Sequence, residues 1–430
     1  MIHELILAGI LGFLCLAVIV SNYRKTHPRL FFQPIVIISL VYLIYCVIGP
    51  SFRIFTGQTS YLQLDMSPFY FEGFIAALIS YISILFGYKL RIGVLIAKAI
   101  PSVGKNDLSG CNLWILGWIL LALGLVGLVT FTAISGASLG AYFYANLFTG
   151  NAPSSKVWTG QGYFFMELIC LFIPGYISLL LSGRMSNRLL ILLLLPIVAV
   201  YASFGFRYRL IALAIAFASA WFLSVNEKIR LVGLAVVGIV AFVVIGFVGL
   251  TRSVDDYSSL DFTAANMGTT ILYETNIFET SACTIHNVPT RFDYVSYKPF
   301  VNSIMFLIPR FIWSEKAGLA YAGIVHQSIG TDEAYGAGVA YMLFCEYYMI
   351  FGWPALILGS IAFGTLCRAF WVYFINNQGN VYTYIVYPMF LTFVFVAIHR
   401  GYMAQHVQYF FSAIILPSLI IGFLTRRRAP

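Results

Sequence analysis

Apolar residues form long, nearly uninterrupted runs along this chain, and the polar residues gather between the runs. Each run is close to the roughly 20 residues that cross the hydrocarbon core of a bilayer as an α-helix. The runs cover residues 2–22, 31–50, 69–88, 113–133, 163–182, 189–205, 210–225, 231–250, 354–375, 381–398 and 408–425. The first begins with His3 and Glu4, and nothing that resembles a cleavage site follows, so we expect a retained span rather than a signal peptide.

Two further apolar stretches fit a membrane span less well than these runs. Residues 299–312 are short and include Pro309 and Arg310, which fits a re-entrant or interfacial segment, and 338–353 is similar. The pattern therefore predicts an all-α fold, a polytopic membrane bundle of about 11–13 transmembrane helices. We expect one integral membrane domain over residues 1–430, with a large periplasmic loop at 251–353 that contains the re-entrant or amphipathic segments.

Composition excludes a soluble protein. The chain is 60% hydrophobic and only 10% charged, and its mean hydropathy is +0.89, whereas a soluble domain carries about 25% charged residues. The seven cysteines form no CxxC pair, so we predict no metal site and no cofactor. A disulfide between Cys283 and Cys345 stays open, and the four cysteines in apolar runs are expected to be buried hydrophobes: Cys15, Cys46, Cys170 and Cys367.

The net charge of +9 reflects orientation and not a nucleic-acid surface. Basic residues follow alternate spans, so they fall on one side of the membrane if the N-terminus is periplasmic and the C-terminus cytoplasmic. They are Arg24, Lys25, Arg29, Lys89, Arg91, Lys98, Lys105, Arg184, Arg188, Lys228, Arg230, Arg368, Arg426, Arg427 and Arg428. These loops hold only two acidic residues, Asp107 and Glu227, and contain no Walker loop or GxGxxG. These loops therefore contain no motif that would support ATP-driven transport or cytoplasmic nucleotide-sugar chemistry.

Several arginines contradict this bias by lying at the outer ends of spans. Guanidinium is always charged and binds phosphate through a bidentate fork, so these residues could hold a lipid diphosphate. The alternative is that they snorkel to phospholipid headgroups or pair with Asp255, Asp256 or Glu346. For Arg310 and Arg400 the apolar sequence surroundings favour a functional role over contact with lipid headgroups or a structural ion pair, because a charge is costly there. The five candidates are Arg207, Arg209, Arg252, Arg310 and Arg400.

Carboxylates and histidines supply candidate proton acceptors. Glu346 lies in an apolar run, where an ionised group needs a cationic partner or a catalytic task. It could act as general base toward a sugar hydroxyl, or form a salt bridge with Arg310. His399 is a second candidate base. For Glu72 and Glu167 we favour a structural role.

The segment from Ile308 to Lys316, which reads IPRFIWSEK, is followed by a Gly-rich stretch and by EYYMIFG at 346–352. This order resembles the bacterial O-antigen (Wzy-type) oligosaccharide repeat-unit polymerases, which carry a Pro-Arg-x-x-Trp-x-x-Lys element and then Glu-x-Tyr-x-x-Phe-Gly before the last spans. The turn at 204–207 and Arg400-Gly401 match further family elements loosely. The Arg-to-Gly spacing of ten residues found in some members is missing, which leaves Arg207 and Arg209 as alternatives.

The resemblance implies a metal-independent glycosyltransferase in the bacterial inner membrane that joins undecaprenyl-diphosphate-linked repeat units on the periplasmic face. Arg310 with Arg207 or Arg209 would then bind the diphosphate, and Glu346 or His399 would help the acceptor hydroxyl. Trp313, Tyr347 and Tyr402 are candidate glycan contacts. Membrane lipids and a chain-length regulator protein are expected partners, and nucleic acid is not.

Two other functions compete with the polymerase. The first is an O-antigen ligase-type transferase, whose arginine chemistry would look alike. The second is a lipid-linked oligosaccharide flippase or transporter, which should show charged or Gly/Pro-broken helices near mid-membrane.

Overall fold

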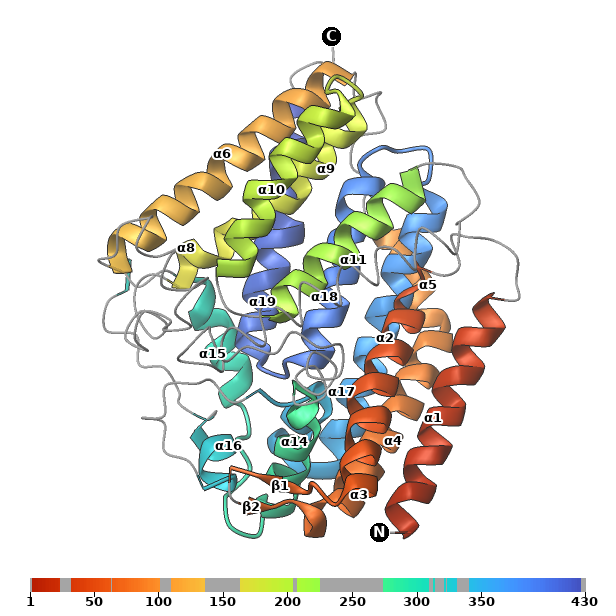
Figure 1. Cartoon of the computed structure of the whole chain (residues 1–430). Helices are drawn as coiled ribbons and strands as arrows, with labels where there is room; N and C mark the ends of the chain where they lie inside the picture. Colours follow the sequence, from red (N-terminus) through yellow and green to blue (C-terminus); the bar gives the residue numbers. More distant parts are fainter. Residues whose placement is uncertain are drawn as a thin grey trace.

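The computed structural model describes residues 2–23, 32–62, 64–100, 110–135, 163–203, 207–224, 274–308, 312–313, 321, 323–330 and 340–426. These residues are mostly helical, and most helices run along one common direction (Figure 1). The N-terminus lies at one end of this bundle and the C-terminus at the other (Figure 1). The order of the elements is as follows.

The first half of the chain contains α1 (Ile2–Tyr23), α2 (Pro34–Tyr42), the π-helical η2 (Leu43–Ile48), α3 (Gly49–Thr56), β1 (Ser60–Tyr61), β2 (Leu64–Asp65), η3 (Ser67–Phe69), α4 (Tyr70–Lys89), α5 (Arg91–Ala99), α6 (Gly110–Ser135), α8 (Tyr163–Leu168), η6 (Ile169–Leu171), α9 (Phe172–Ser182), α10 (Asn187–Ser203) and α11 (Arg207–Ser224). The second half contains η8 (Glu274–Asn276), α14 (Ile277–Asn287), α15 (Lys298–Leu307), α16 (Gly323–Ser328), α17 (Leu343–Asn376), α18 (Thr383–His399), α19 (Met403–Phe410), the π-helical η10 (Phe411–Ile415) and α20 (Leu416–Arg426). The strands form one small antiparallel hairpin, in which Ser60 pairs with Asp65.

Seven helical segments of the described chain are long and apolar enough to cross a membrane, which confirms an all-α multi-pass membrane protein. They are Ile2–Asn22, Pro34–Thr56, Ser67–Lys89, Asn112–Ile134, Phe165–Ser182, Leu343–Asn376 and Met403–Phe423. Three more predicted spans appear as shorter apolar helices, Asn187–Ala202, Tyr208–Leu223 and Thr383–His399. The predicted span at 231–250 lies outside the described residues.

Helices α4 and α17 pack closely because small residues face each other. A Cβ at Gly87 would collide with the carbonyl oxygen of Ile361, and one at Gly364 with that of Ile84. Serine hydroxyls add polar contacts, since Ser80 and Ser360 are hydrogen-bonded at 2.8 Å. Small residues and buried hydroxyls are the usual means of helix association inside a membrane.

Helix α17 is broken near its start. Phe351 leaves helical geometry, and Gly352 has φ 68°, ψ −147°. A Cβ at Gly359 would lie 2.7 Å from the Tyr347 ring, although 12 residues of continuous helix would separate the two by about 18 Å. The segment 343–350 therefore folds back on the segment 353–376. The break coincides with the predicted boundary between the stretch 338–353 and the span 354–375.

The described part of the predicted loop 251–353 contains α14, α15 and α16. A buried ion pair fixes α14 to the first spans, because Arg53 of α3 contacts Glu279 at 2.9 Å. Tyr70 of α4 donates to the same carboxylate at 3.1 Å. The periplasmic location of this loop is a prediction from the distribution of basic residues along the chain.

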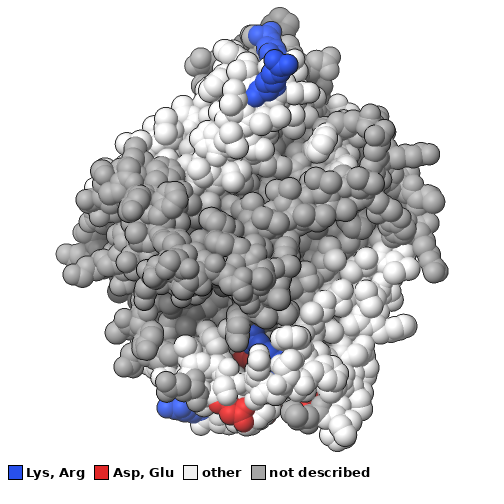
Figure 2. Space-filling view, in the orientation of Figure 1, with Lys and Arg blue, Asp and Glu red and all other residues white. Residues whose placement is uncertain are grey.

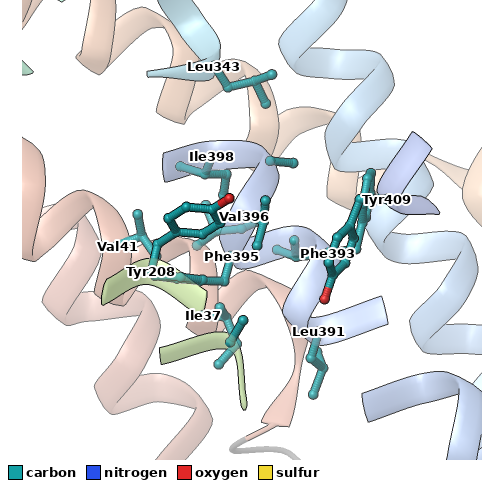
Figure 3. Close-up of a cluster of buried hydrophobic side chains, with 14 of the residues drawn as sticks. Ile37, Val41, Tyr208, Leu343, Leu391, Phe393, Phe395, Val396, Ile398 and Tyr409 are labelled. Carbon is teal, nitrogen blue, oxygen red and sulfur yellow. The ribbon is translucent and has the colours of Figure 1, made fainter. Parts of the chain in front are cut away.

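Charged side chains are sparse on the described surface. Figure 2 shows basic atoms at the upper end of one face, and basic and acidic atoms toward its lower end. The interior is apolar and aromatic: Tyr208 of α11 lies beside Val41 of α2 and Ile398 of α18 (Figure 3). Contact between α11 and α18 brings this tyrosine close to the end of α18.

Candidate functional site

The connection between α18 and α19 is the meeting point of the candidate residues. Helix α18 ends at His399, Arg400 and Gly401 form a non-helical turn, and α19 begins at Met403 after its N-cap residue Tyr402. The turn is held against the residues that precede α17, because the Gly401 N–H donates to the Tyr341 carbonyl oxygen at 2.6 Å. A Cβ at Gly401 would lie 2.6 Å from the Met342 carbonyl oxygen, so this approach requires glycine.

Two predicted phosphate-binding arginines converge on Tyr208. The Arg400 guanidinium carbon lies 4.5 Å from the centre of the Tyr208 ring. The Arg209 Nε donates to the Tyr208 hydroxyl at 3.2 Å, and Gln405 of α19 donates to the same oxygen at 3.1 Å. Cation–π contact of this kind is worth roughly 0.5–2 kcal/mol, depending on desolvation. Arginines from α11 and from the α18–α19 turn thus share one aromatic partner.

Arg209 is also engaged in a buried ion pair. Its Nη2 lies 2.9 Å from the Glu167 Oε1, and both side chains are almost fully buried. Glu167 belongs to α8, 42 residues earlier in the sequence. The sequence favoured a structural role for Glu167 and phosphate binding for Arg209. The structure pairs the two, so Arg209 reaches the site as half of a neutral pair, while Arg400 is half-buried beside it.

Glu346 is fully buried, and its carboxylate accepts three hydrogen bonds. Tyr321 donates to Oε1 at 2.6 Å, Tyr341 donates to Oε2 at 2.7 Å, and the Met403 N–H donates to Oε1 at 3.1 Å. The two phenolic distances are typical of O–H···O⁻ bonds. Burial raises the pKa of both tyrosines, so both hydroxyls remain protonated donors.

The described residues give Glu346 no ion-pair partner. The predicted salt bridge to Arg310 lies outside the described residues. Hydroxyl and amide donors therefore replace a cation around this carboxylate in the described part of the chain. One of them, the Met403 N–H, belongs to the same turn as Arg400, which connects the carboxylate to the arginine cluster.

Tyr402 is the one predicted glycan residue found at this carboxylate. Its ring lies 5.6 Å from the Tyr321 ring and 5.8 Å from the Phe306 ring of α15, and it is half-buried. Half-exposed aromatic rings can stack on sugar rings, and glycan binding by Tyr402 stays a prediction.

His399 lies among aromatic rings. Its ring is 4.6 Å from that of Tyr45, 5.4 Å from Phe395 and 6.0 Å from Tyr208. Its Nδ1 is buried without a hydrogen-bond partner among the described residues. His399 therefore belongs to the arginine side of the turn and not to the hydrogen-bond set of Glu346.

The remaining predicted site residues are not gathered here. Arg252 and Arg310 lie outside the described residues, and so does the side chain of Arg207, the first residue of α11. Trp313 is 45% exposed. Tyr347 lines an apolar cavity.

Sequence reasoning missed the tyrosines. In the sequence Tyr208 lies between Arg207 and Arg209, which are candidates because of their charge. Tyr321 and Tyr341 belong to no motif that would indicate a glutamate partner. Only the folded chain brings residue 321 to residue 346. Glu72, for which we favoured a structural role, lies 3.2 Å from His286, a residue without a predicted role. The cysteines Cys283 and Cys345 are both free, so the disulfide that the sequence left open is not formed.

No protein-family model, curated protein or solved structure matches this chain. Among the described residues, no group of three or more His, Cys, Asp or Glu side chains could hold a metal ion.

Proposed function

We propose that this protein is a glycan polymerase that joins undecaprenyl-diphosphate-linked oligosaccharide repeat units, as the O-antigen-type polymerases that its sequence resembles do. The observation that carries the proposal is the meeting of Arg400 and Arg209 at Tyr208, one turn away from a buried carboxylate. Under the orientation that the basic loops favour, the N-terminus is periplasmic and the chemistry takes place at the periplasmic face of the inner membrane.

The arginines serve the leaving group. When the bond between the sugar anomeric carbon and the diphosphate oxygen breaks, its electron pair stays on the diphosphate and negative charge accumulates there. A fixed guanidinium in a partly dehydrated site stabilises this charge more than water does. Arg400 faces the diphosphate in the proposed complex, and Arg209 holds Tyr208 beneath it. Because guanidinium supplies the positive charge, the proposed enzyme is metal-independent.

Glu346 serves the acceptor. The acceptor hydroxyl oxygen attacks the anomeric carbon and must lose its proton. The Tyr321 ring lies 5.6 Å from the ring of half-buried Tyr402 at an angle of 34°, and in this mechanism its hydroxyl faces the acceptor sugar that Tyr402 holds. The proton passes to the Tyr321 oxygen while the Tyr321 proton moves to Glu346 Oε1 across 2.6 Å. The products are the elongated glycan, the free lipid diphosphate and a protonated Glu346.

One observation favours a second candidate, a flippase or transporter of lipid-linked oligosaccharide. The break at Phe351 and Gly352 and the buried carboxylate on the short segment before it are features of transporter helices as well. A transporter would move the lipid-linked repeat across a vesicle membrane without changing it covalently. The two functions therefore differ in their products.

The decisive test uses purified full-length protein and a synthetic lipid-diphosphate-linked repeat, with a chelator such as EDTA present. We expect a ladder of polymer that is unchanged by the chelator. Transfer of a preformed glycan to lipid A core without a ladder would indicate a ligase. Movement of unchanged substrate across proteoliposomes without a ladder would indicate a transporter, and a ladder abolished by EDTA would contradict the arginine chemistry.

A further inference from the structure

A cavity of about 620 Å³ lies between α5, α17, α18 and α19. Such a volume is within the range of pockets that bury an organic ligand, about 300–1,000 Å³. Its walls include Ile92 and Ile96 of α5, Ile361 and Ala362 of α17, and Phe393 and Ala397 of α18. Apolar side chains from three helices, α5, α17 and α18, therefore line the cavity.

Two polar side chains in the wall, those of Thr365 and His406, are hydrogen-bonded to the protein itself. The Thr365 hydroxyl bonds to the carbonyl oxygens of Gly87 and Ile361 at 3.2 and 2.9 Å. The His406 Nε2 contacts the carbonyl oxygen of Arg400. A glycan placed here would lose hydrogen bonds to water and gain few in return, which is costly. A hydrocarbon chain has no such requirement.

The cavity shares residues with the candidate site. Met403 lines it, and the Met403 backbone N–H donates to Glu346. Leu343 and Tyr347 line it from the same short helical segment that carries Glu346. His406 lines it and contacts the backbone of Arg400. One end of the cavity thus adjoins both the carboxylate and the arginine turn.

We propose that this cavity receives the polyprenyl chain of the lipid-diphosphate donor, a proposal that rests on the function proposed above. The diphosphate lies at the Arg400 turn, and the first isoprene units enter between Met403 and Tyr347. The chain continues along α17 toward α5 in a groove that is open to the surroundings, since Ile92 and Leu358 in its wall are 53% and 67% exposed. The bilayer core and the groove are both apolar, so this path is favoured by packing against the helices and by the diphosphate held at Arg400, and not by removal of the chain from water.

The test is photolabelling without turnover. Full-length protein in phospholipid nanodiscs is irradiated with a polyprenyl diphosphate that lacks sugar and carries a photoreactive group in its first isoprene units. The labelled peptides are then identified by mass spectrometry. We expect label within 358–366 or 393–397, and we expect unlabelled polyprenyl diphosphate to compete with it while excess phospholipid does not. Label confined to other helices, or equal competition by phospholipid, would overturn the proposal.

Two variants narrow the cavity from positions where the fold tolerates a larger side chain. Ala362 and Leu358 both line the cavity, and both are exposed at the surface of the protein. Ala362→Trp and Leu358→Trp should each reduce labelling about tenfold, because the indole occupies space that the chain would fill and the chain loses packing contacts there. The matched control is Ala17→Trp at an exposed alanine of α1, which should label like the wild type. Wild-type labelling in both cavity variants would overturn the proposal.

Failure of this inference and failure of the proposed function are separable. Polymer formation with label outside the cavity would contradict only the proposal that the polyprenyl chain binds in the cavity. Label in the cavity without polymer formation would support binding of the polyprenyl chain there and contradict the proposed polymerase activity.

Discussion

The Arg400 guanidinium lies over the Tyr208 ring, with 4.5 Å between its central carbon and the ring centre. This contact joins α11 to the α18–α19 turn, two segments almost two hundred residues apart in the chain. It also places Arg400 beside Arg209, whose Nε donates to the Tyr208 hydroxyl. The aromatic face orients one guanidinium, and the hydroxyl orients the other.

Two variants of Tyr208 should therefore separate the effect of its aromatic ring on polymerisation from the effect of its hydroxyl. Tyr208→Phe keeps the ring under Arg400 and should leave the polymerisation rate within about threefold of wild type, with a lower melting temperature because the buried Arg209 Nε loses its acceptor. Tyr208→Leu removes the ring and should slow polymerisation by up to about thirtyfold, which corresponds to the upper part of the cation–π range. Equal rates for the two variants would argue against an orienting role of the ring.

The Arg209–Glu167 pair should behave as a buried ion pair. Removing one partner by Glu167→Ala leaves an uncompensated charge and should destabilise the protein by about 3–5 kcal/mol. Replacing both by Arg209→Met with Glu167→Leu should restore much of the thermal stability. Thermal unfolding in detergent measures both. If the single variant unfolds like the wild type, the pair does not stabilise the fold.

Tyr321 and Tyr341 provide a matched pair around Glu346, because both donate to its carboxylate at nearly equal distances. Loss of either hydroxyl should cost similar stability, about 1–3 kcal/mol. Only Tyr321→Phe interrupts the proposed proton path, so it should slow polymerisation by about 10²–10⁴-fold, whereas Tyr341→Phe should not. Similar rates in the two variants would remove the relay from the mechanism.

Packing of α4 on α17 makes a prediction about the fold alone. Gly364→Ala places a Cβ against the carbonyl oxygen of Ile84 and should destabilise the protein by about 1–3 kcal/mol, since backbone must shift. Gly9→Ala on α1 meets no atom within 4 Å and is the control. Unchanged melting of the Gly364 variant would contradict the close approach of these helices.

Hydropathy predicted the helices well because a bilayer imposes one length and one polarity on every span. Ten of the eleven predicted runs correspond to described helices, and the break in α17 falls where Gly352 and Pro354 interrupt the apolar pattern.

Partners were harder to predict than spans. Glu167 and Arg209 are 42 residues apart, and Tyr321 and Glu346 are 25 apart. Neither pair follows a helical spacing, so only the tertiary arrangement brings them together. A sequence shows that a buried charge needs a partner, but a hydroxyl, an amide and a cation satisfy that need equally well.

The central claim is that Arg400 stabilises the departing diphosphate. The measurement is the single-turnover rate at which purified protein releases polyprenyl diphosphate from a lipid-linked repeat, for wild type, Arg400→Lys and Arg400→Ala. We predict a loss of about 10²–10³-fold for Arg400→Ala in protein that stays folded, with only the small drop in melting temperature expected from the lost cation–π contact, and incomplete rescue by Arg400→Lys because ammonium lacks the bidentate fork. A wild-type release rate in folded Arg400→Ala protein would contradict the account.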